Sequence, residues 1–289
     1  MQIKANGISL EYEEFGPKDG VPLVLIRGLG TQMIHWPRAF LDGFAARGYR
    51  VVIFDNRDAG LSARCPAPGV SGKAEDILAT FNEGRVPKAS YKLDDMALDV
   101  IGLMDALGIA RAHIFGISMG GGIAQLLAIN HADRLLSDTM VMTSAGLRDP
   151  SLLPQLLVHP ETREEAEESW LQGHADCGSH GFAMSEAEIR AEAVSAWQRA
   201  HDDEGVNRQL LAIFSSEPRI EALNEVTLPC LVIHGAIDTL IPPEAGEHLA
   251  SLIPGARLEI VEGMGHFITP KLSPVLVEMV DGFIRGLRP

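Results

Sequence analysis

Long hydrophobic runs and paired cysteines are both missing from this sequence of 289 residues. No segment approaches the roughly 20 consecutive apolar residues that a membrane-crossing helix needs, and the longest apolar runs have the length of a strand. The three cysteines, Cys65, Cys177 and Cys230, are odd in number, lie far apart and form no C-x-x-C pair. This usage fits a reducing compartment and argues against a disulfide framework or a zinc site.

Basic residues are also scarce, since 24 lysines and arginines stand against 39 aspartates and glutamates, for a formal net charge of −15. That balance argues against sequence-independent binding of phosphate backbones, and it makes nucleic acid and anionic membranes unsuitable partners. Residues 1–16 alternate between polar and apolar types and lack the continuous apolar core of a signal peptide. We therefore expect an acidic cytoplasmic protein, long enough to bury a core without disulfide or metal staples.

Strand and helix patterns alternate along most of the chain. Asn6-Gly7 lies between two extended runs and predicts a hairpin, because both residues tolerate positive φ. Short apolar runs predict buried strands at Val21–Ile26, Tyr49–Phe54, Ala112–Ile117, Leu136–Thr143, Cys230–His234 and Leu258–Val261. Helices are predicted at Phe40–Arg47, Leu93–Leu107, Met119–Asn130, Ala245–Leu252 and Val275–Leu287. This order indicates an α/β fold with a mostly parallel central sheet and helices on both faces.

Two segments interrupt the alternation. Residues 147–225 carry helical patterns and no good strand, so we interpret them as a helical cap inserted into a core domain of residues 1–146 and 226–289. Its helices are expected at Leu152–Val158, Arg163–Leu171, Glu186–His201 and Val206–Phe214. Five glutamates between Glu161 and Glu168 are typical of a solvated helix face. The prolines and glycines between Arg64 and Ser90 predict a long loop.

The most informative motif is Gly116-Ile117-Ser118-Met119-Gly120, a G-x-S-x-G pattern. It follows a predicted strand and opens a predicted helix, and in that context the serine lies on a strained turn at the strand's carboxyl end. The glycines remove side chains that would collide with neighbouring elements, and the helix N-terminus favours developing negative charge. Ser118 is therefore the candidate nucleophile.

A serine nucleophile needs an adjacent base, which a third group orients. His266 follows the last predicted strand and Asp238 follows the penultimate one, so both belong at the sheet edge that carries Ser118. His234 ends its own strand and is expected to be a core histidine. The chain order Ser118, Asp238, His266 differs from the two common serine-protease orders.

Stabilisation of the oxyanion requires two backbone N–H groups. Met119, directly after the nucleophile, is expected to supply one, and Leu29, in the loop Arg27-Gly28-Leu29-Gly30, the other. A dinucleotide fingerprint is the rival interpretation of that loop, but its third glycine is missing because Met33 stands there. We therefore expect no cofactor and no metal.

Taken together, these motifs resemble the α/β-hydrolase superfamily, and within it the capped serine esterases, including the anthracycline methylesterase type. The resemblance covers the chain outside the cap and is carried by RGLG at 27–30, DNRDAGLS at 55–62, GISMGGG at 116–122, HGAID at 234–238 and GMGH at 263–266. It implies that Asp55 and Arg57 anchor loops beneath the site. Arg27 departs from the pattern, because many members have histidine before the oxyanion glycine.

The predicted function is hydrolysis of a small-molecule carboxylic ester through an acyl-enzyme. A serine at position 118 excludes the superfamily's haloalkane dehalogenases and epoxide hydrolases, which need an aspartate there. Lactonases, amidases, perhydrolases and carbon–carbon hydrolases use the same triad and stay open, and so does a non-catalytic small-molecule receptor of this fold. Aromatic and aliphatic residues of the cap favour a small to medium, apolar substrate; they include Trp170, Phe182, Met184, Trp197, Leu210, Leu211 and Phe214.

Overall fold

A computed structural model describes residues 1–146, 153–157 and 160–287. Its centre is one eight-stranded sheet with the strand order β1-β2-β4-β3-β5-β6-β7-β8. The strands are β1 (Gln2–Ala5), β2 (Ile8–Phe15), β3 (Val21–Ile26), β4 (Tyr49–Phe54), β5 (Ala112–Ile117), β6 (Leu135–Val141), β7 (Cys230–Gly235) and β8 (Arg257–Val261). Strand β2 pairs antiparallel with both β1 and β4, and the pairs from β4 to β8 are parallel. The predicted, mostly parallel sheet is confirmed.

Local sequence explains the sheet's first turn and its centre. Asn6 and Gly7 have φ values of 48° and 78°, as the predicted hairpin turn requires. All six residues of β5 are buried, as are all six of β7. A strand buried on both faces has a nearly continuous apolar run, and this is why the boundaries of the inner strands could be predicted closely.

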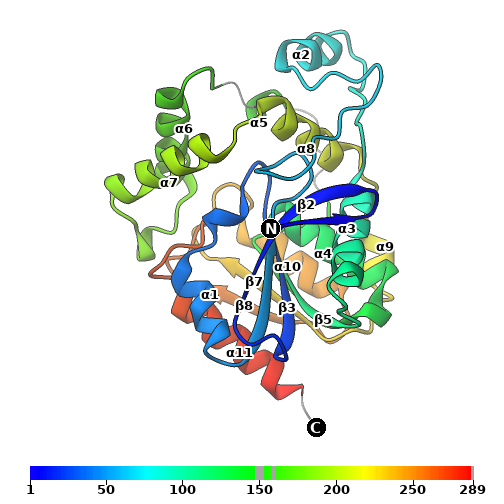
Figure 1. Cartoon of the computed structure of the whole chain (residues 1–289), viewed down its shortest axis with the longest axis vertical. Coiled ribbons are helices and arrows are strands. Elements are labelled where there is room, and N and C mark those ends of the chain that lie inside the picture. Colours follow the sequence, from blue (N-terminus) through cyan, green and yellow to red (C-terminus); the bar gives the residue numbers. More distant parts are fainter. Residues whose placement is uncertain (147–152, 158–159, 288–289) are drawn as a thin grey trace.

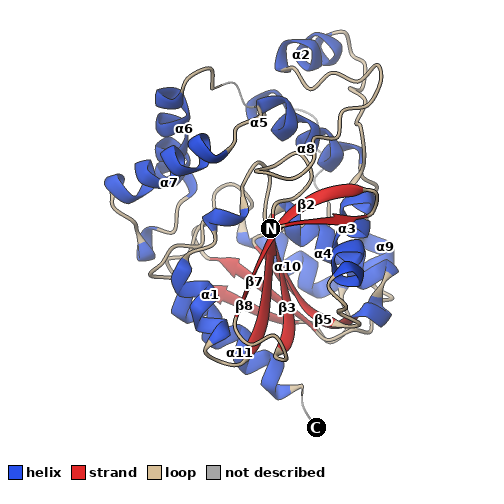
Figure 2. Ribbon diagram, in the orientation of Figure 1, coloured by secondary structure: helices blue, strands red, loops and turns tan. Residues whose placement is uncertain are grey.

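Helices cover both faces of the sheet (Figure 2), and each face has its own apolar cluster. The helices of the core are α1 (Arg38–Ala45), α3 (Leu93–Ala106), α4 (Met119–Asn130), α10 (Pro243–Leu252) and α11 (Ser273–Gly286), with short 3-10 turns η1 (Met33–His35) and η2 (Ala132–Arg134). One cluster joins α3, α4 and α10 to the sheet, and the other joins α1 and α11 to the opposite face. The layered α/β architecture is therefore the predicted one.

Helices α5 to α8 lie between β6 and β7 in the chain and gather at one end of the sheet (Figure 1). We call them the helical insert: α5 (Leu153–Leu156), α6 (Arg163–Cys177), α7 (Glu186–Arg199) and α8 (Asp203–Ser215), with η4 (His180–Phe182) after α6. Thr162, Ser185 and Asp202 cap α6, α7 and α8 by accepting backbone N–H bonds. The short α9 (Ile220–Leu223) packs on α4 of the core. The expected insert boundary at residue 147 lies outside the described residues.

The long loop predicted between Arg64 and Ser90 is wrong in its middle, where α2 (Ala74–Asn82) forms. Ala74 and Ile77 are buried against Leu153, Leu157 and α8. The surrounding prolines and glycines concealed this short amphipathic pattern, and its partner surface belongs to the insert. Helix α6 also continues to Cys177, six residues beyond its expected end at Leu171.

The described part of the chain holds no helix that combines the length and the apolar character needed to cross a membrane.

Candidate active site

Ser118 lies on a sharp turn between β5 and α4. Its φ of 54° and ψ of −120° are unusual for a residue with a side chain, and such strain typically marks a functional position. A Cβ on Gly116 would lie 2.2 Å from the carbonyl oxygen of Gly120, and a Cβ on Gly120 would lie 2.3 Å from that of Ile26. Only glycine fits at either place, so the motif's spacing follows from the close approach of β5, α4 and β3.

Three predicted residues meet at the carboxyl edge of the sheet. His266 Nε2 lies 3.0 Å from Ser118 Oγ, and His266 Nδ1 lies 2.7 Å from Asp238 Oδ2. Asp238 follows β7 and His266 follows β8, so loops after neighbouring strands bring them to the turn after β5. With Nδ1–H donating to the carboxylate, Nε2 is left as the acceptor that faces the serine hydroxyl.

The Asp238 carboxylate is buried and held by backbone donors. Its Oδ1 accepts N–H bonds from Leu240 at 3.0 Å and Ile241 at 2.9 Å. His234 also lies close, with Nε2 3.6 Å from Asp238 Oδ2 and 2.8 Å from the carbonyl oxygen of Ile241. Burial lowers the pKa of His234, so the imidazole is neutral beside the carboxylate. The predicted core histidine thus packs directly under the acid.

The two residues predicted to bind an oxyanion through their N–H groups are Leu29, in the loop after β3, and Met119, the first residue of α4. Neither backbone N–H donates a hydrogen bond within the described ranges, and Met119 opens α4, where no intrahelical acceptor exists. A Cβ on Gly28 would lie 3.2 Å from Ser118 Cβ, so the loop touches the nucleophile. The next amide, Gly30 N–H, is already bound to Gln209 Oε1 of α8 at 2.9 Å.

Arg27 supports this loop from inside the protein. Its guanidinium donates to Thr31 Oγ1 at 3.1 Å and to the carbonyl oxygen of His35 at 3.3 Å, and it lies 4.7 Å from the centre of the Trp36 ring. Burial lowers the pKa of Arg27 to about 10, partly opposed by Glu192 of α7. The side chain that departs from the superfamily pattern therefore ties residues 27–36 together.

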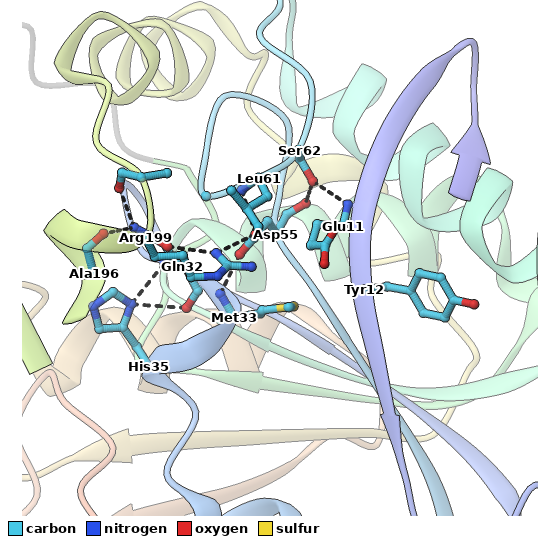
Figure 3. A network of polar contacts seen from close by, with 12 residues as sticks. Glu11, Tyr12, Gln32, Met33, His35, Asp55, Leu61, Ser62, Ala196 and Arg199 are labelled. Carbon is cyan, nitrogen blue, oxygen red and sulfur yellow. Dashed lines mark hydrogen bonds and ion pairs between the residues drawn. The ribbon is translucent and has the colours of Figure 1, made fainter. Parts of the chain in front are cut away.

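Asp55 links three parts of the structure (Figure 3). Its carboxylate accepts the N–H of Met33 at 2.7 Å and of Leu61 at 2.9 Å, and it pairs with Arg199 of α7 at 2.7 Å. Gln32 adds a second link, because its amide donates to the carbonyl oxygens of Ala196 and Ala200. The resemblance implied an anchoring role for Asp55, and its contacts extend that role to the helical insert.

Two further buried ion pairs involve the same turn after β4. Arg57 Nε and Nη2 donate to both oxygens of Asp99 of α3 at 2.6 and 2.7 Å. Asp58 pairs with Arg208 of α8, whose Nη2 lies 2.7 Å from Asp58 Oδ1. Arg57 thus fixes the turn to the core, and Asp58 fixes it to the insert.

A cavity of about 270 Å³ lies between the insert and the loop Arg27-Gly28-Leu29-Gly30, which we call the oxyanion loop after its predicted role. Leu29 and His35 contribute to one wall, and Trp170, Trp197 and Val206 to the other. None of the three residues Ser118, Asp238 and His266 lines it. Burial lowers the pKa of His35 to about 3, so this wall carries no positive imidazole at neutral pH.

Several supporting residues were not predicted, among them Gln209, Gln32, Arg199 and Ser179. Gln209 is fully buried and also donates to the carbonyl oxygen of Arg57 at 2.6 Å. The polar run Asn207-Arg208-Gln209 in an otherwise amphipathic helix is the one available signal. This polar run can be interpreted only once the position of α8 against the core is known.

Comparison with known proteins agrees with the fold. Residues 23–274 match the alpha/beta hydrolase family. The chain is 28% identical to a rhodomycin D methylesterase of Streptomyces peucetius over 91% of each chain, and 26% identical to a non-heme chloroperoxidase of Streptomyces lividans over 98% of each. Among solved structures, the enol-lactonase of Burkholderia xenovorans superposes with a TM-score of 0.80 at 25% identity, over 99% of this chain and 100% of that one. The chain belongs to the alpha/beta hydrolase family.

Proposed function

We propose that this chain is a serine hydrolase that cleaves carboxylic esters through an acyl-enzyme, with Ser118 as nucleophile, His266 as base and Asp238 as orienting acid. The observation that carries the proposal is the chain of contacts from Ser118 Oγ to His266 Nε2 to Asp238 Oδ2, at 3.0 and 2.7 Å. Nucleophile, base and orienter within hydrogen-bond reach of one another are the geometric requirement for this chemistry.

In the first half of the reaction, Ser118 Oγ attacks the ester carbonyl carbon while His266 Nε2 takes the hydroxyl proton. The oxyanion forms beside the free N–H groups of Leu29 and Met119, and losing one such donor typically costs about 3 kcal/mol of transition-state stabilisation. His266 then gives the proton to the leaving alcohol. The carbon–oxygen bond breaks, and the acyl group remains on Ser118.

In the second half, His266 takes a proton from water, whose oxygen attacks the acyl carbon. Collapse of the second tetrahedral intermediate returns the proton to Ser118 Oγ and releases the carboxylic acid. Asp238 stays ionised throughout and stabilises the imidazolium. The three side chains, the two backbone N–H groups and one water molecule as reactant account for every step of the proposed reaction.

The substrate class is supported by the relatives and by a cavity that adjoins Leu29, although Ser118, Asp238 and His266 do not line it. Family membership and the methylesterase name of one relative support an esterase-type hydrolase. We treat the helical insert as the cap, residues 147–225, whose Trp170 and Trp197 face a cavity beside the oxyanion loop. Apolar walls of this kind favour a small to medium, apolar ester. A lactone, which is a cyclic ester, is the second candidate, favoured by the enol-lactonase neighbour.

Steady-state hydrolysis of p-nitrophenyl esters, from acetate to decanoate, tests the proposal. We expect many turnovers by the wild type and at least a 1,000-fold loss of kcat in Ser118→Ala. The three residues of a triad act as a unit, and removing one of them lowers kcat about 10⁴- to 10⁶-fold in a serine protease. Ser144→Ala, a nearby serine outside the triad, is the control and should keep its activity. No turnover of these esters or of lactones by folded wild type would contradict the proposal and favour a non-catalytic receptor.

A further inference from the structure

The end of α6 and the turn after it run alongside the loop that carries His266. The N–H of His266 donates to the carbonyl oxygen of Cys177 at 2.6 Å, and the N–H of Gly181 donates to that of Gly263 at 2.9 Å. A Cβ on Gly265 would lie 2.3 Å from the carbonyl oxygen of Gly178. The two backbones are therefore packed in direct contact, and at Gly265 there is no room for a Cβ.

Ser179 occupies the middle of this contact and is 2% exposed. Its Oγ accepts the N–H of Gly265 at 2.9 Å and donates to the carbonyl oxygen of Phe267 at 2.6 Å. These two groups belong to the residues on either side of His266. A single hydroxyl thus holds the chain both before and after the imidazole, while the backbone of Cys177 holds the amide between them.

Neighbouring contacts extend the same attachment. Thr239, next to the acid Asp238, donates its hydroxyl to the carbonyl oxygen of Asp176 at 2.8 Å. The rings of His174 and Phe267 lie 3.9 Å apart, centre to centre. The loops that carry the base and the acid therefore rest on one segment of the insert, residues 174–183.

We propose that Ser179 is a positioning residue that holds His266 Nε2 toward Ser118 Oγ. This inference rests on the proposed function, because it assigns a role to Ser179 in the same site. Removing the hydroxyl leaves one N–H donor and one carbonyl acceptor buried without partners, and unpaired buried groups drive local rearrangement. A shift of about 1 Å in a catalytic group costs on the order of 100-fold in rate, so a small movement of the loop has a large effect.

The test compares Ser179→Ala with Ser185→Ala. Ser185 is a control in the same insert: its hydroxyl caps α7 by accepting the N–H of Glu188 at 3.3 Å and donates to Glu188 Oε2 at 2.7 Å. For p-nitrophenyl butyrate we expect Ser179→Ala to lower kcat about 10- to 100-fold with KM changed less than threefold, and Ser185→Ala to leave both within threefold. Equal losses in the two variants, or unchanged kcat in Ser179→Ala, would overturn the proposal.

A readout independent of turnover is the NMR chemical shifts of the His266 ring, recorded at one pH on histidine-labelled protein and assigned with His266→Gln. The His266 ring shifts of Ser179→Ala should differ from those of the wild type, whereas Ser185→Ala should reproduce them. This measurement applies even to a wild type without esterase activity, so it separates failure of the positioning role from failure of the proposed function. Identical His266 ring shifts in all three proteins would overturn the positioning role.

Ser179→Cys is a second variant for the case in which Ser179→Ala does not fold. A thiol keeps a weak donor and a weak acceptor at the same place, on a larger atom. We expect an intermediate loss of kcat, about 3- to 10-fold, with KM unchanged. A folded Ser179→Cys with wild-type kcat would contradict the role of the hydroxyl.

Discussion

Buried acids divide into two groups at the scale of single residues. Asp55, Asp58 and Asp238 each meet several donors, and each lies where a loop of the site is anchored. Asp138, in the middle of β6, is also fully buried, but neither of its carboxyl oxygens meets a hydrogen-bond donor. An unpaired carboxyl in such a place is neutral in the folded protein, because burial penalises the charged form.

Asp138→Asn should therefore stabilise the protein at alkaline pH. Burial raises the pKa of Asp138 well above its usual value, and the backbone of Thr139 opposes this in part. The unfolded chain ionises this carboxyl from about pH 4 upward, so stability is full below that pH and is lost as pH rises toward the folded pKa. Urea unfolding should show a higher midpoint for the variant at pH 8 and converging midpoints near pH 3.

The control for that series is Asp133→Asn, which changes an exposed acid in the neighbouring turn η2. Its unfolding midpoint should follow the wild type across the same pH range. If the unfolding midpoint of Asp138→Asn also follows the wild type at every pH, the buried Asp138 carboxyl is not neutral in the folded protein.

The three candidate catalytic residues could be singled out from the sequence, but the residues that support them could not. Ser118, Asp238 and His266 each follow a recognisable strand, and carboxyl ends of parallel strands share one edge. Ser179 and Gln209 lie in the insert, and the sequence around them does not indicate which groups their side chains contact. Their partners depend on how the insert docks, which is a property of the tertiary structure.

At the scale of elements, α8 connects the insert to the oxyanion loop. Gln209 of this helix accepts the N–H of Gly30 and donates to the carbonyl oxygen of Arg57. It thereby occupies the amide next to Leu29 and holds the loop in the shape that leaves the Leu29 N–H free. The strands and core helices that frame this contact were predicted closely, whereas α2, whose Ala74 packs on the same helix, was missed.

Gln209→Ala should weaken both folding and catalysis. Two buried polar groups lose their partners, at a cost of about 1–3 kcal/mol each when left unsatisfied, and the freed oxyanion loop should lower kcat/KM about 10-fold. Gln198→Ala, at an exposed position of the same insert, is the matched control and should change neither. Denaturant unfolding and ester kinetics measure the two effects, and wild-type kcat/KM in Gln209→Ala would contradict the role of this contact.

At the scale of the whole molecule, the insert is fastened to the core by buried ion pairs. Arg199 and Arg208 reach from α7 and α8 to Asp55 and Asp58, two acids of the single turn after β4. Together with the attachment at Ser179, the insert contacts the core on both sides of the catalytic edge. The insert therefore contacts the loops that carry Asp238 and His266 as well as the turn after β4.

Arg208→Met should destabilise the protein strongly, because Asp58 stays buried after its partner is gone. Breaking one side of a buried pair typically costs about 3–5 kcal/mol, and replacing both sides costs much less. The double variant Arg208→Met with Asp58→Asn should therefore recover part of the lost stability in thermal or urea unfolding. Arg163→Met, which breaks an exposed pair on α6, should cost less than about 1 kcal/mol. A double variant less stable than Arg208→Met alone would refute this account of the docking.

The central claim is that Ser118 carries the acyl group, and mass spectrometry of the protein quenched during turnover of a slow p-nitrophenyl ester tests it directly. Tryptic cleavage after Arg111 and Arg134 yields peptide 112–134, in which Ser118 is the sole hydroxyl side chain. We predict the mass of one acyl group on that peptide in the wild type and no adduct in Ser118→Ala. In His266→Gln the acyl group either accumulates on the peptide or, where acylation itself is slow, is absent. An acyl group on another peptide, or turnover that persists in Ser118→Ala, would contradict the account.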